Sequence, residues 1–291
     1  MNRLTTDKRC QIVAALVEGN SIRATCRITG AAKNTVTKLL ADLGWACELY
    51  QIEVFKNLPC KRVQCDEIWS FCYAKDKNVP EHKKDVFGYG DVWTWVALDA
   101  DTKLVPCWRV GLRDEETAIA FIQDLADRLA NRVQLATDGF SVYLEAVDDV
   151  FEGEIDYAML RKIYGTTAKY ANQASGKYNP ARQVATRRRV ICGAPDSAHI
   201  STSYVERQNL TMRMGMRRFT RLTNGFSKKV ENHACAVALH FTHYNFCRIH
   251  RTLKTTPAVA AGVADHVWGI GKIVGLLESE PANRQGAKQS A

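Results

Sequence analysis

Hydrophobic side chains recur at helical spacing through the first forty residues of the chain. The pattern predicts a helix over residues 7–18, a short helix that Ser21 caps and Gly30 ends, and a third helix over 34–43. Helix, helix, tight turn and helix is the order of a helix-turn-helix. We therefore predict a DNA-binding helix-turn-helix domain over residues 1–44. The alternative is an ordinary three-helix bundle used for contact or dimerisation.

The start of the third predicted helix is polar and basic. Side chains there can form hydrogen bonds with base edges or with phosphates. These residues are Lys33, Asn34, Thr35, Thr37 and Lys38.

The pattern changes to that of strands at about residue 60, after a predicted connector over 45–59. Residues 61–73, 91–99 and 103–112 are rich in Val, Ile and aromatic residues, which predicts three successive strands. A helix capped by Asp114, a strand over 132–137, a helix over 141–151 and a strand over 155–164 follow. This order predicts an α/β domain of the ribonuclease H-like type, with a mixed sheet and helices on its faces.

The chain after residue 164 is predicted to contain a basic insertion and three helices. Residues 165–195 show little apolar periodicity and predict a loop or extended insertion. A helix then begins among Ser201, Thr202 and Ser203, a long helix covers 227–248, and a shorter one begins at Thr256-Pro257. The predicted catalytic domain spans residues 60–277, and 278–291 form a flexible tail.

Charge is distributed unevenly along the 291 residues. The net charge is +9, but residues 157–230 hold fifteen Lys or Arg against two acids, so this segment carries +13 and the remainder −4. Such a basic block is the usual footprint of a nucleic-acid groove. The ten cysteines include no CxxC pair, no secretory signal is evident, and no apolar run reaches membrane-spanning length. These features predict a cytoplasmic protein with reduced cysteines and no membrane partner.

Three carboxylates are candidates for a metal centre. Asp66 lies in an apolar strand, Asp138 ends a strand before Gly139, and Glu206 lies on the helix that follows the basic insertion. Acids at strand ends and on a neighbouring helix can converge, and oxygen ligands suit a pair of Mg²⁺ ions in phosphodiester chemistry. Strand alternation does not choose between Asp66 and Glu67, and Asp138 before glycine could equally be a turn residue.

Four longer motifs carry a resemblance to a known family. They are CDEIWSF at 65–71, ATDGF at 136–140, STSYVERQNLTMR at 201–213, and YNFCRIHRTL at 244–253 followed by TPA at 256–258. The chain resembles bacterial insertion-sequence transposases of the DDE type, most closely the group named after the first-numbered insertion sequence. The resemblance covers roughly residues 3–277. It implies that Asp66, Asp138 and Glu206 are the catalytic metal ligands, which resolves the choice between Asp66 and Glu67.

Some relatives have an N-terminal zinc-binding element, which this chain does not match. Cys10, Cys26 and Cys47 are not spaced as zinc ligands. A second possible zinc motif, His240-x2-His243-x3-Cys247-x2-His250, lies along one predicted helical stripe. Because zinc ligands usually come from more than one element, we favour a structural role for it.

The resemblance implies a transposase that cleaves the ends of its own element and joins them to target DNA, using two Mg²⁺ or Mn²⁺ ions. Its expected partners are double-stranded DNA, as terminal inverted repeats and target, and further copies of itself in a dimer or higher oligomer. Two alternatives stay open: a catalytically degenerate DNA-binding regulator, and a ribonuclease H-like nuclease without strand transfer. Basic residues expected to hold phosphates are Arg187, Arg188, Arg189, Arg207, Arg213, Arg217 and Arg218.

Overall fold

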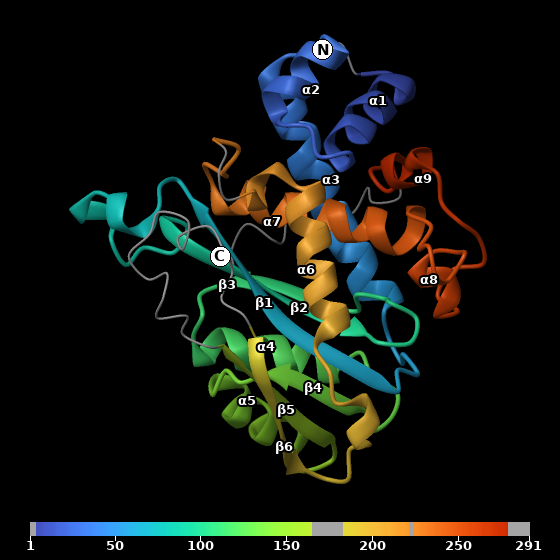
Figure 1. The fold of residues 1–291 in the computed structure, drawn as a ribbon. Helices are drawn as coiled ribbons and strands as arrows, with labels where there is room; N and C mark the ends of the chain where they lie inside the picture. Colours follow the sequence, from blue (N-terminus) through green and yellow to red (C-terminus); the bar gives the residue numbers. More distant parts are fainter. Residues whose placement is uncertain (1–3, 165–182, 221–223, 279–291) are drawn as a thin grey trace.

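The computed structural model describes residues 4–164, 183–220 and 224–278. Its centre is a six-stranded mixed sheet in the order β3-β2-β1-β4-β5-β6 (Figure 1). The strands are β1 (Arg62–Cys72), β2 (Gly90–Asp99), β3 (Trp108–Gly111), β4 (Gln134–Asp138), β5 (Asp156–Tyr164) and β6 (Gln183–Cys192). The first three strands form an antiparallel meander, β4 and β5 run parallel to β1, and β6 is antiparallel to β5. The predicted α/β class and mixed sheet are confirmed.

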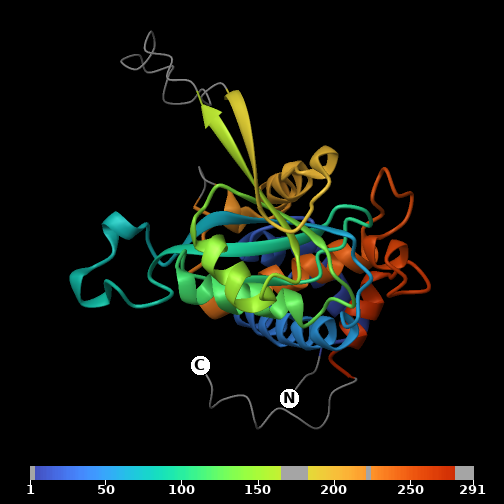
Figure 2. The same ribbon diagram turned by 90° about the horizontal axis from the view of Figure 1, so that it is seen from below.

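Helices cover both faces of this sheet. On one face, α6 (Ser203–Gly215) crosses β1 and β2. The other face carries α4 (Glu115–Ala126) and α5 (Val142–Phe151), which connect β3 to β4 and β4 to β5. Figure 2 shows α6 and these two helices on opposite sides of the strands. As predicted, Asp114 caps α4, since its carboxylate accepts from the backbone N–H of Thr117 at 3.0 Å.

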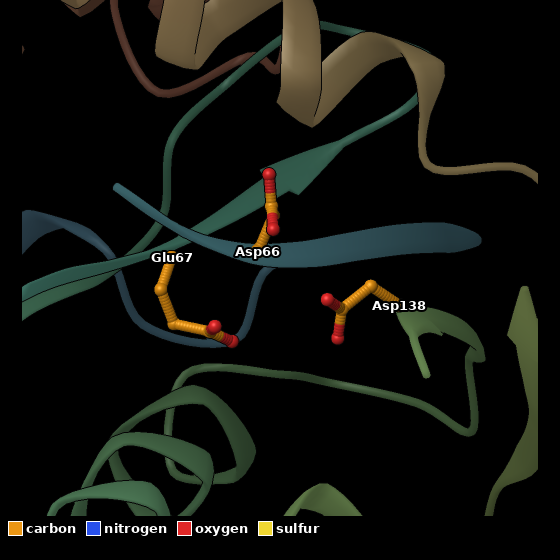
Figure 3. A group of neighbouring side chains, drawn as sticks. All are labelled: Asp66, Glu67 and Asp138. Carbon is orange, nitrogen blue, oxygen red and sulfur yellow. The ribbon is translucent and has the colours of Figure 1, made fainter. Parts of the chain in front are cut away.

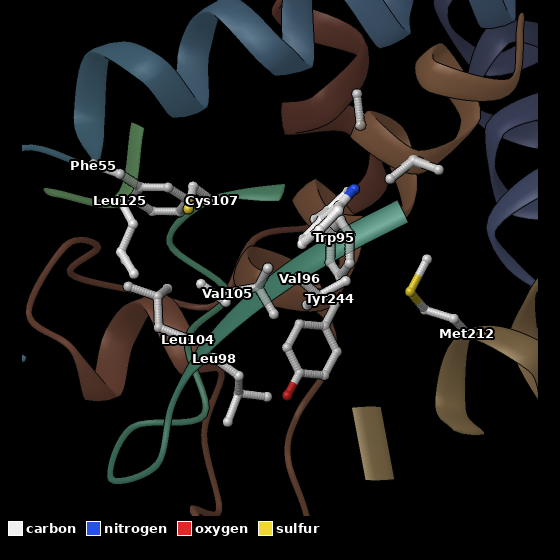
Figure 4. Packing of buried hydrophobic residues seen from close by; sticks show 14 of the residues in the cluster. Phe55, Trp95, Val96, Leu98, Leu104, Val105, Cys107, Leu125, Met212 and Tyr244 are labelled. Atoms are coloured by element: carbon white, nitrogen blue, oxygen red, sulfur yellow. The ribbon is translucent and has the colours of Figure 1, made fainter. Parts of the chain in front are cut away.

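The remaining helices pack together beside the sheet. They are α1 (Thr6–Val17), α2 (Ile22–Thr29), α3 (Lys33–Val54), α7 (Val230–Thr242), α8 (Pro257–Ala260) and α9 (Ile270–Gly275). A π-helical turn, His243–Cys247, continues α7. Buried residues of these helices and of the sheet form one hydrophobic cluster, part of which Figure 4 shows around Trp95, Tyr244 and Met212. The N-terminal helices therefore share a core with the sheet, through Val36 and Leu43 of α3 for example.

The third helix is longer than predicted. It continues through Gly44 to Val54, so most of the expected connector over 45–59 is helical. Gly44 marks a close helix crossing: a Cβ built there would lie 2.3 Å from Cys235 Cβ of α7. The glycine permits this approach between α3 and α7 and does not end the helix.

The basic insertion also differs from the prediction. Residues 183–192, expected in a loop or extended insertion, form the regular strand β6, which extends the sheet edge by pairing with β5. Its side chains from Val184 to Val190 are exposed, so the strand has no apolar face for a sequence pattern to reveal. The β5–β6 ribbon projects away from the body of the protein in Figure 2. The other part of the predicted insertion, 165–182, lies outside the described residues, as does nearly all of the predicted tail.

Candidate active site

Asp66 and Asp138 lie side by side because of the strand register. Cys65 of β1 pairs with Thr137 of β4 in the parallel ladder, and each acid is the next residue along its strand. Figure 3 shows the two carboxylates projecting close to each other from the two strands. Asp138 is held by its own turn, because the backbone N–H of Phe140 donates to Asp138 Oδ1 at 2.9 Å.

Glu206 reaches the same cavity from helix α6. The cavity has a volume of about 460 Å³ and is lined by acidic, basic and apolar residues from several elements. The lining residues are Asp66, Arg113, Asp138, Gly139, Phe140, Leu160, Arg161, Lys162 and Glu206. The structure therefore brings the three acids singled out in the sequence to one cavity.

The three acids are not equally close. Ligand oxygens of Asp66, Glu67 and Asp138 all lie within 4.8 Å of one another, and Glu206 is outside this tight group. The Glu206 carboxylate is occupied by other partners. Thr202 Oγ1 donates to its Oε1 at 2.6 Å, and Lys162 forms an ion pair with its Oε2. Glu206 would have to exchange Lys162 for a metal ion to complete a carboxylate ligand set.

Asp66 and Glu67 project to opposite faces of β1, as consecutive strand residues must. On the α6 side, Asn209 Nδ2 donates to Asp66 Oδ2 at 2.8 Å. On the other side, the almost fully buried Glu67 accepts from Arg113 Nε at 3.2 Å and lies near the buried Tyr143. Asp66 lines the 460 Å³ cavity and Glu67 does not. The geometry thus gives Asp66 access to a bound ligand and gives Glu67 a buried, salt-bridged position.

Burial and mutual repulsion disfavour the charged forms of these acids. Burial, then the nearby Asp138, raises the pKa of Asp66 to about 7, although the bond from Asn209 opposes this. The pKa of Glu67 is raised to about 7 by the same two causes, and burial raises the pKa of Asp138. Carboxylates that lie close together despite burial and mutual repulsion are typical of a site that a bound cation stabilises.

The donor set fits a hard divalent cation. Carboxylate oxygens are the ligands that Mg²⁺ and Mn²⁺ prefer, and the cavity is open enough to admit a phosphate beside them. Lys162, Arg161 and Arg113 surround the acids and could hold phosphate oxygens. These three cations were not among the predicted site residues. Strand alternation could have indicated Lys162, because it lies two residues after Leu160, which pairs with Asp138, and so projects to the same face of the sheet as Asp138.

The residues predicted to bind DNA are distributed over three surfaces. Lys33, Asn34 and Thr37 line a second, larger cleft together with Arg217 and Arg218. Arg187, Arg188 and Arg189 are exposed on the β5–β6 ribbon, and Arg207 is exposed on α6. Arg213 and Thr35 are partly buried.

Lys38 and Arg218 form side-chain contacts within the protein. Lys38 forms an ion pair with Asp42 at 2.7 Å, one turn further along α3. Arg218 donates to Ser227 Oγ at 2.7 Å.

The histidine and cysteine motif at the end of α7 does not form a metal cluster in the described part of the chain, where Asp66, Glu67 and Asp138 are the group found. His240 is buried, and burial lowers its pKa to about 3. His250 lies beyond the π-helical turn, where its Nδ1 contacts Thr252 Oγ1 at 2.9 Å. The ten cysteines are free thiols.

Comparisons with known proteins found transposases among solved structures. The chain is similar to a piggyBac transposase in a synaptic complex with hairpin DNA, with 11% identity, a TM-score of 0.35, and coverage of 94% of this chain and 71% of that one. It is also similar to a Mos1 transposase paired-end complex with left transposon end (13%, TM-score 0.23, 54% and 60% covered) and to a Mos1 strand transfer complex (13%, 0.25, 84% and 78%).

Similarity at this level does not establish a family or an activity for the chain. No family model and no curated protein matches the sequence. In the described residues, no helix is both long enough and apolar enough to cross a membrane.

Proposed function

We propose that this protein is a metal-dependent DNA transposase of the DDE type that cleaves phosphodiester bonds at the ends of its element and transfers the 3′-hydroxyls to target DNA. One observation carries the proposal: Asp66, Asp138 and Glu206, from two parallel strands and a helix, meet at one cavity bordered by Lys162, Arg161 and Arg113. The three sequence motifs that contain these acids, and the fourth at 244–258, support the same reading.

Asp66, Asp138 and Glu206 would hold two Mg²⁺ or Mn²⁺ ions. Bound there, such ions would activate the attacking oxygen and stabilise the leaving oxygen of an in-line displacement. Asn209 orients the Asp66 carboxylate by its hydrogen bond, and the Phe140 N–H orients that of Asp138. Lys162, which is paired with Glu206 in the structure, would turn to a phosphate oxygen of the bound DNA.

The N-terminal helices provide the proposed end-recognition element. The structure contains three helices in the predicted order, with Ser21 Oγ accepting from Ala24 N at 3.1 Å at the start of α2. Gly30 ends α2 with a φ of 69°. We propose that the start of α3 reads the terminal repeats and that the exposed arginines of the ribbon and of α6 hold phosphates. Because two ends must be joined together, at least two copies of the chain would act in one complex.

Strand cleavage and joining by the purified full chain tests the proposal. The substrate is duplex DNA that carries the flanks of the gene, incubated with Mg²⁺ or with Ca²⁺. We expect cleavage and joining in Mg²⁺, and only binding in Ca²⁺. Glu206→Gln should abolish cleavage and keep DNA binding, whereas Glu231→Gln, which neutralises an exposed acid of α7, should keep both.

Three outcomes distinguish the proposal from its alternatives. Binding without cleavage in Mg²⁺ or Mn²⁺ would favour a degenerate DNA-binding regulator. Cleavage without joining would favour a nuclease. Cleavage by Glu206→Gln at the wild-type rate would remove Glu206 from the ligand set.

A further inference from the structure

The cavity that holds Asp66, Asp138 and Glu206 is called the acidic cavity below. A second, larger cavity lies between the N-terminal helices and the start of α7. Its volume is about 810 Å³, and its walls come from α1, α2, α3, the end of α6 and residues within 216–218 and 224–240. Gly19, between α1 and α2, packs closely against the end of α6. Its φ is 80°, and a Cβ built there would lie 2.8 Å from the Gly215 carbonyl oxygen. We name this cavity the interhelical cleft.

Cations from both walls project into the interhelical cleft, and the described residues that line it include no acid. Arg23 and Lys33 stand on α2 and α3. The opposite wall supplies further cations from the segment that joins α6 to α7, namely Arg217, Arg218, Lys228 and Lys229. None of the six forms an ion pair with a described carboxylate. Six like charges around one cavity repel one another, and a bound anion would relieve that repulsion.

Three side chains show this unbalanced charge and polarity in detail. Burial lowers the pKa of Lys228, and the nearby Arg23 lowers it further, so two cations from opposite walls oppose each other. Arg218 is partly buried, with a hydroxyl group, Ser227 Oγ, as its hydrogen-bond acceptor. His240, which is 93% buried, has an Nε2 atom without a partner among the described residues. A polar atom buried this deeply normally has a partner, so the Nε2 atom of His240 indicates a ligand.

The polar residues of the interhelical cleft are suited to phosphate. Asn34 and Asn232 add amide donors to the guanidinium and ammonium groups. The cleft also includes Lys33, Asn34 and Thr37, the start of the helix expected to contact DNA. That helix therefore does not stand alone, because cations of the segment between α6 and α7 face it across the cleft.

We infer that the interhelical cleft is a second nucleic-acid site, in which both walls together hold phosphates of a DNA backbone. This inference rests on the proposed function in taking DNA as the ligand. Helix α6 connects the two sites, since Glu206 faces the acidic cavity and Gly215 lines the cleft. Nine residues of helix correspond to about 14 Å, roughly the rise of four base pairs, so one DNA duplex could occupy both sites.

Salt-dependent DNA binding by the full chain tests this inference. The measurement is fluorescence anisotropy with a labelled duplex in EDTA, so that no cleavage occurs and failure of catalysis cannot affect the result. The slope of log K against log salt concentration is negative, and each phosphate contact that is lost reduces its magnitude by about 0.9. For the double variant Arg23→Ala/Lys228→Ala we therefore expect a slope whose magnitude is about 1.8 smaller than that of wild type. Arg23→Lys/Lys228→Arg should retain most of the wild-type slope.

The matched control is Arg27→Ala/Lys272→Ala. Arg27 lies one turn after Arg23 on α2, Lys272 lies on α9, and both are exposed outside the cleft. We expect the control to keep the wild-type slope. Equal slopes for wild type and the Arg23/Lys228 variant, with both proteins folded by circular dichroism, would overturn the inference.

A tripolyphosphate titration separates a DNA backbone from a free polyphosphate as the ligand. If tripolyphosphate raises the melting temperature of wild type but not of the Arg23/Lys228 variant, and the DNA slopes are equal, the cleft binds a free polyphosphate and the DNA assignment is wrong. A slope of smaller magnitude for the variant supports the DNA assignment whether or not tripolyphosphate also binds.

Discussion

Asn209 Nδ2 donates to Asp66 Oδ2 at 2.8 Å, which joins the middle of helix α6 to the middle of strand β1 across 143 residues of sequence. The bond holds the Asp66 carboxylate, which lines the acidic cavity. It also favours the ionised form of Asp66, against burial and the charge of Asp138. Asn209 is thus placed as a positioning residue for the proposed metal centre.

Removing this hydrogen bond should raise the pKa of Asp66. For Asn209→Ala we expect the acid limb of the cleavage rate profile to move to higher pH, because Asp66 must be ionised to bind a cation. The measurement is cleavage rate against pH at saturating DNA. Thr211→Ala, on the same helix but outside the cavity, is the control and should leave the limb in place. An unshifted limb in Asn209→Ala would contradict the positioning role.

The raised pKa of Asp66 predicts that the metal-free protein becomes less stable as this carboxyl group ionises with rising pH. Its folded value of about 7 exceeds the unfolded value of about 3.9, so the folded state binds the proton more tightly. The contribution of this group to stability is therefore present at low pH and is lost as the pH rises from about 4 to about 7. In EDTA at pH 8, Asp66→Asn should melt roughly 2 °C or more above wild type, the shift given by about 1 kcal/mol.

Mg²⁺ should reverse this order of melting temperatures, so that wild type melts above Asp66→Asn. We expect the ion to raise the melting temperature of wild type more than that of Asp66→Asn, since binding to the folded state stabilises it. The same scans with Mg²⁺ at pH 8 measure this. Equal shifts in the two proteins would show that Asp66 does not hold the ion.

Lys162 should compete with the proposed metal ion for Glu206. Because Lys162 is paired with the Glu206 carboxylate, a cation that binds there must displace it. For Lys162→Met we expect a several-fold lower Mg²⁺ concentration at half-maximal thermal stabilisation, and slower cleavage because a phosphate contact is lost. Arg207→Met, which removes an exposed cation of α6, should not change the Mg²⁺ requirement. A higher Mg²⁺ requirement in Lys162→Met would contradict the competition.

We expect Glu67 to contribute less than Asp66 to Mg²⁺-dependent cleavage. It is almost fully buried and paired with Arg113, and it does not line the acidic cavity. We expect Glu67→Gln to retain Mg²⁺-dependent cleavage at a reduced rate, whereas Asp66→Asn should abolish it. The comparison requires only the two purified variants and the cleavage assay. The reverse order would transfer the ligand role to Glu67.

The contact between α3 and α7 predicts a large effect on stability. A Cβ at Gly44 would lie 2.3 Å from Cys235 Cβ, so Gly44→Ala must force the two helices apart. We expect a loss of at least about 2 kcal/mol of unfolding free energy, measured by urea denaturation. Gly271→Ala is the control, because nothing lies within 4 Å of its Cβ position on α9. It should be neutral or slightly stabilising.

The sequence by itself determined much of the fold and the choice of acids. Apolar periodicity predicted the order of strands and helices from β1 to β5, because half-buried strands and amphipathic helices must repeat with fixed periods. It did not predict β6, whose exposed arginines have no buried face, nor the length of α3, which continues through Gly44 to Val54. Motifs, and not periodicity, selected Asp66 over Glu67.

Tertiary structure alone decided how the charged groups meet. The parallel register of β1 and β4 sets Asp66 beside Asp138, and the path of α6 brings Asn209 to Asp66 and Glu206 to Lys162. The interhelical cleft likewise combines Arg23 with Lys228, which are 205 positions apart in the sequence. Periodicity reports which face of an element is buried, but it carries no information on which distant element will cover that face. The positions of charges across the cavities therefore follow only from the packed structure.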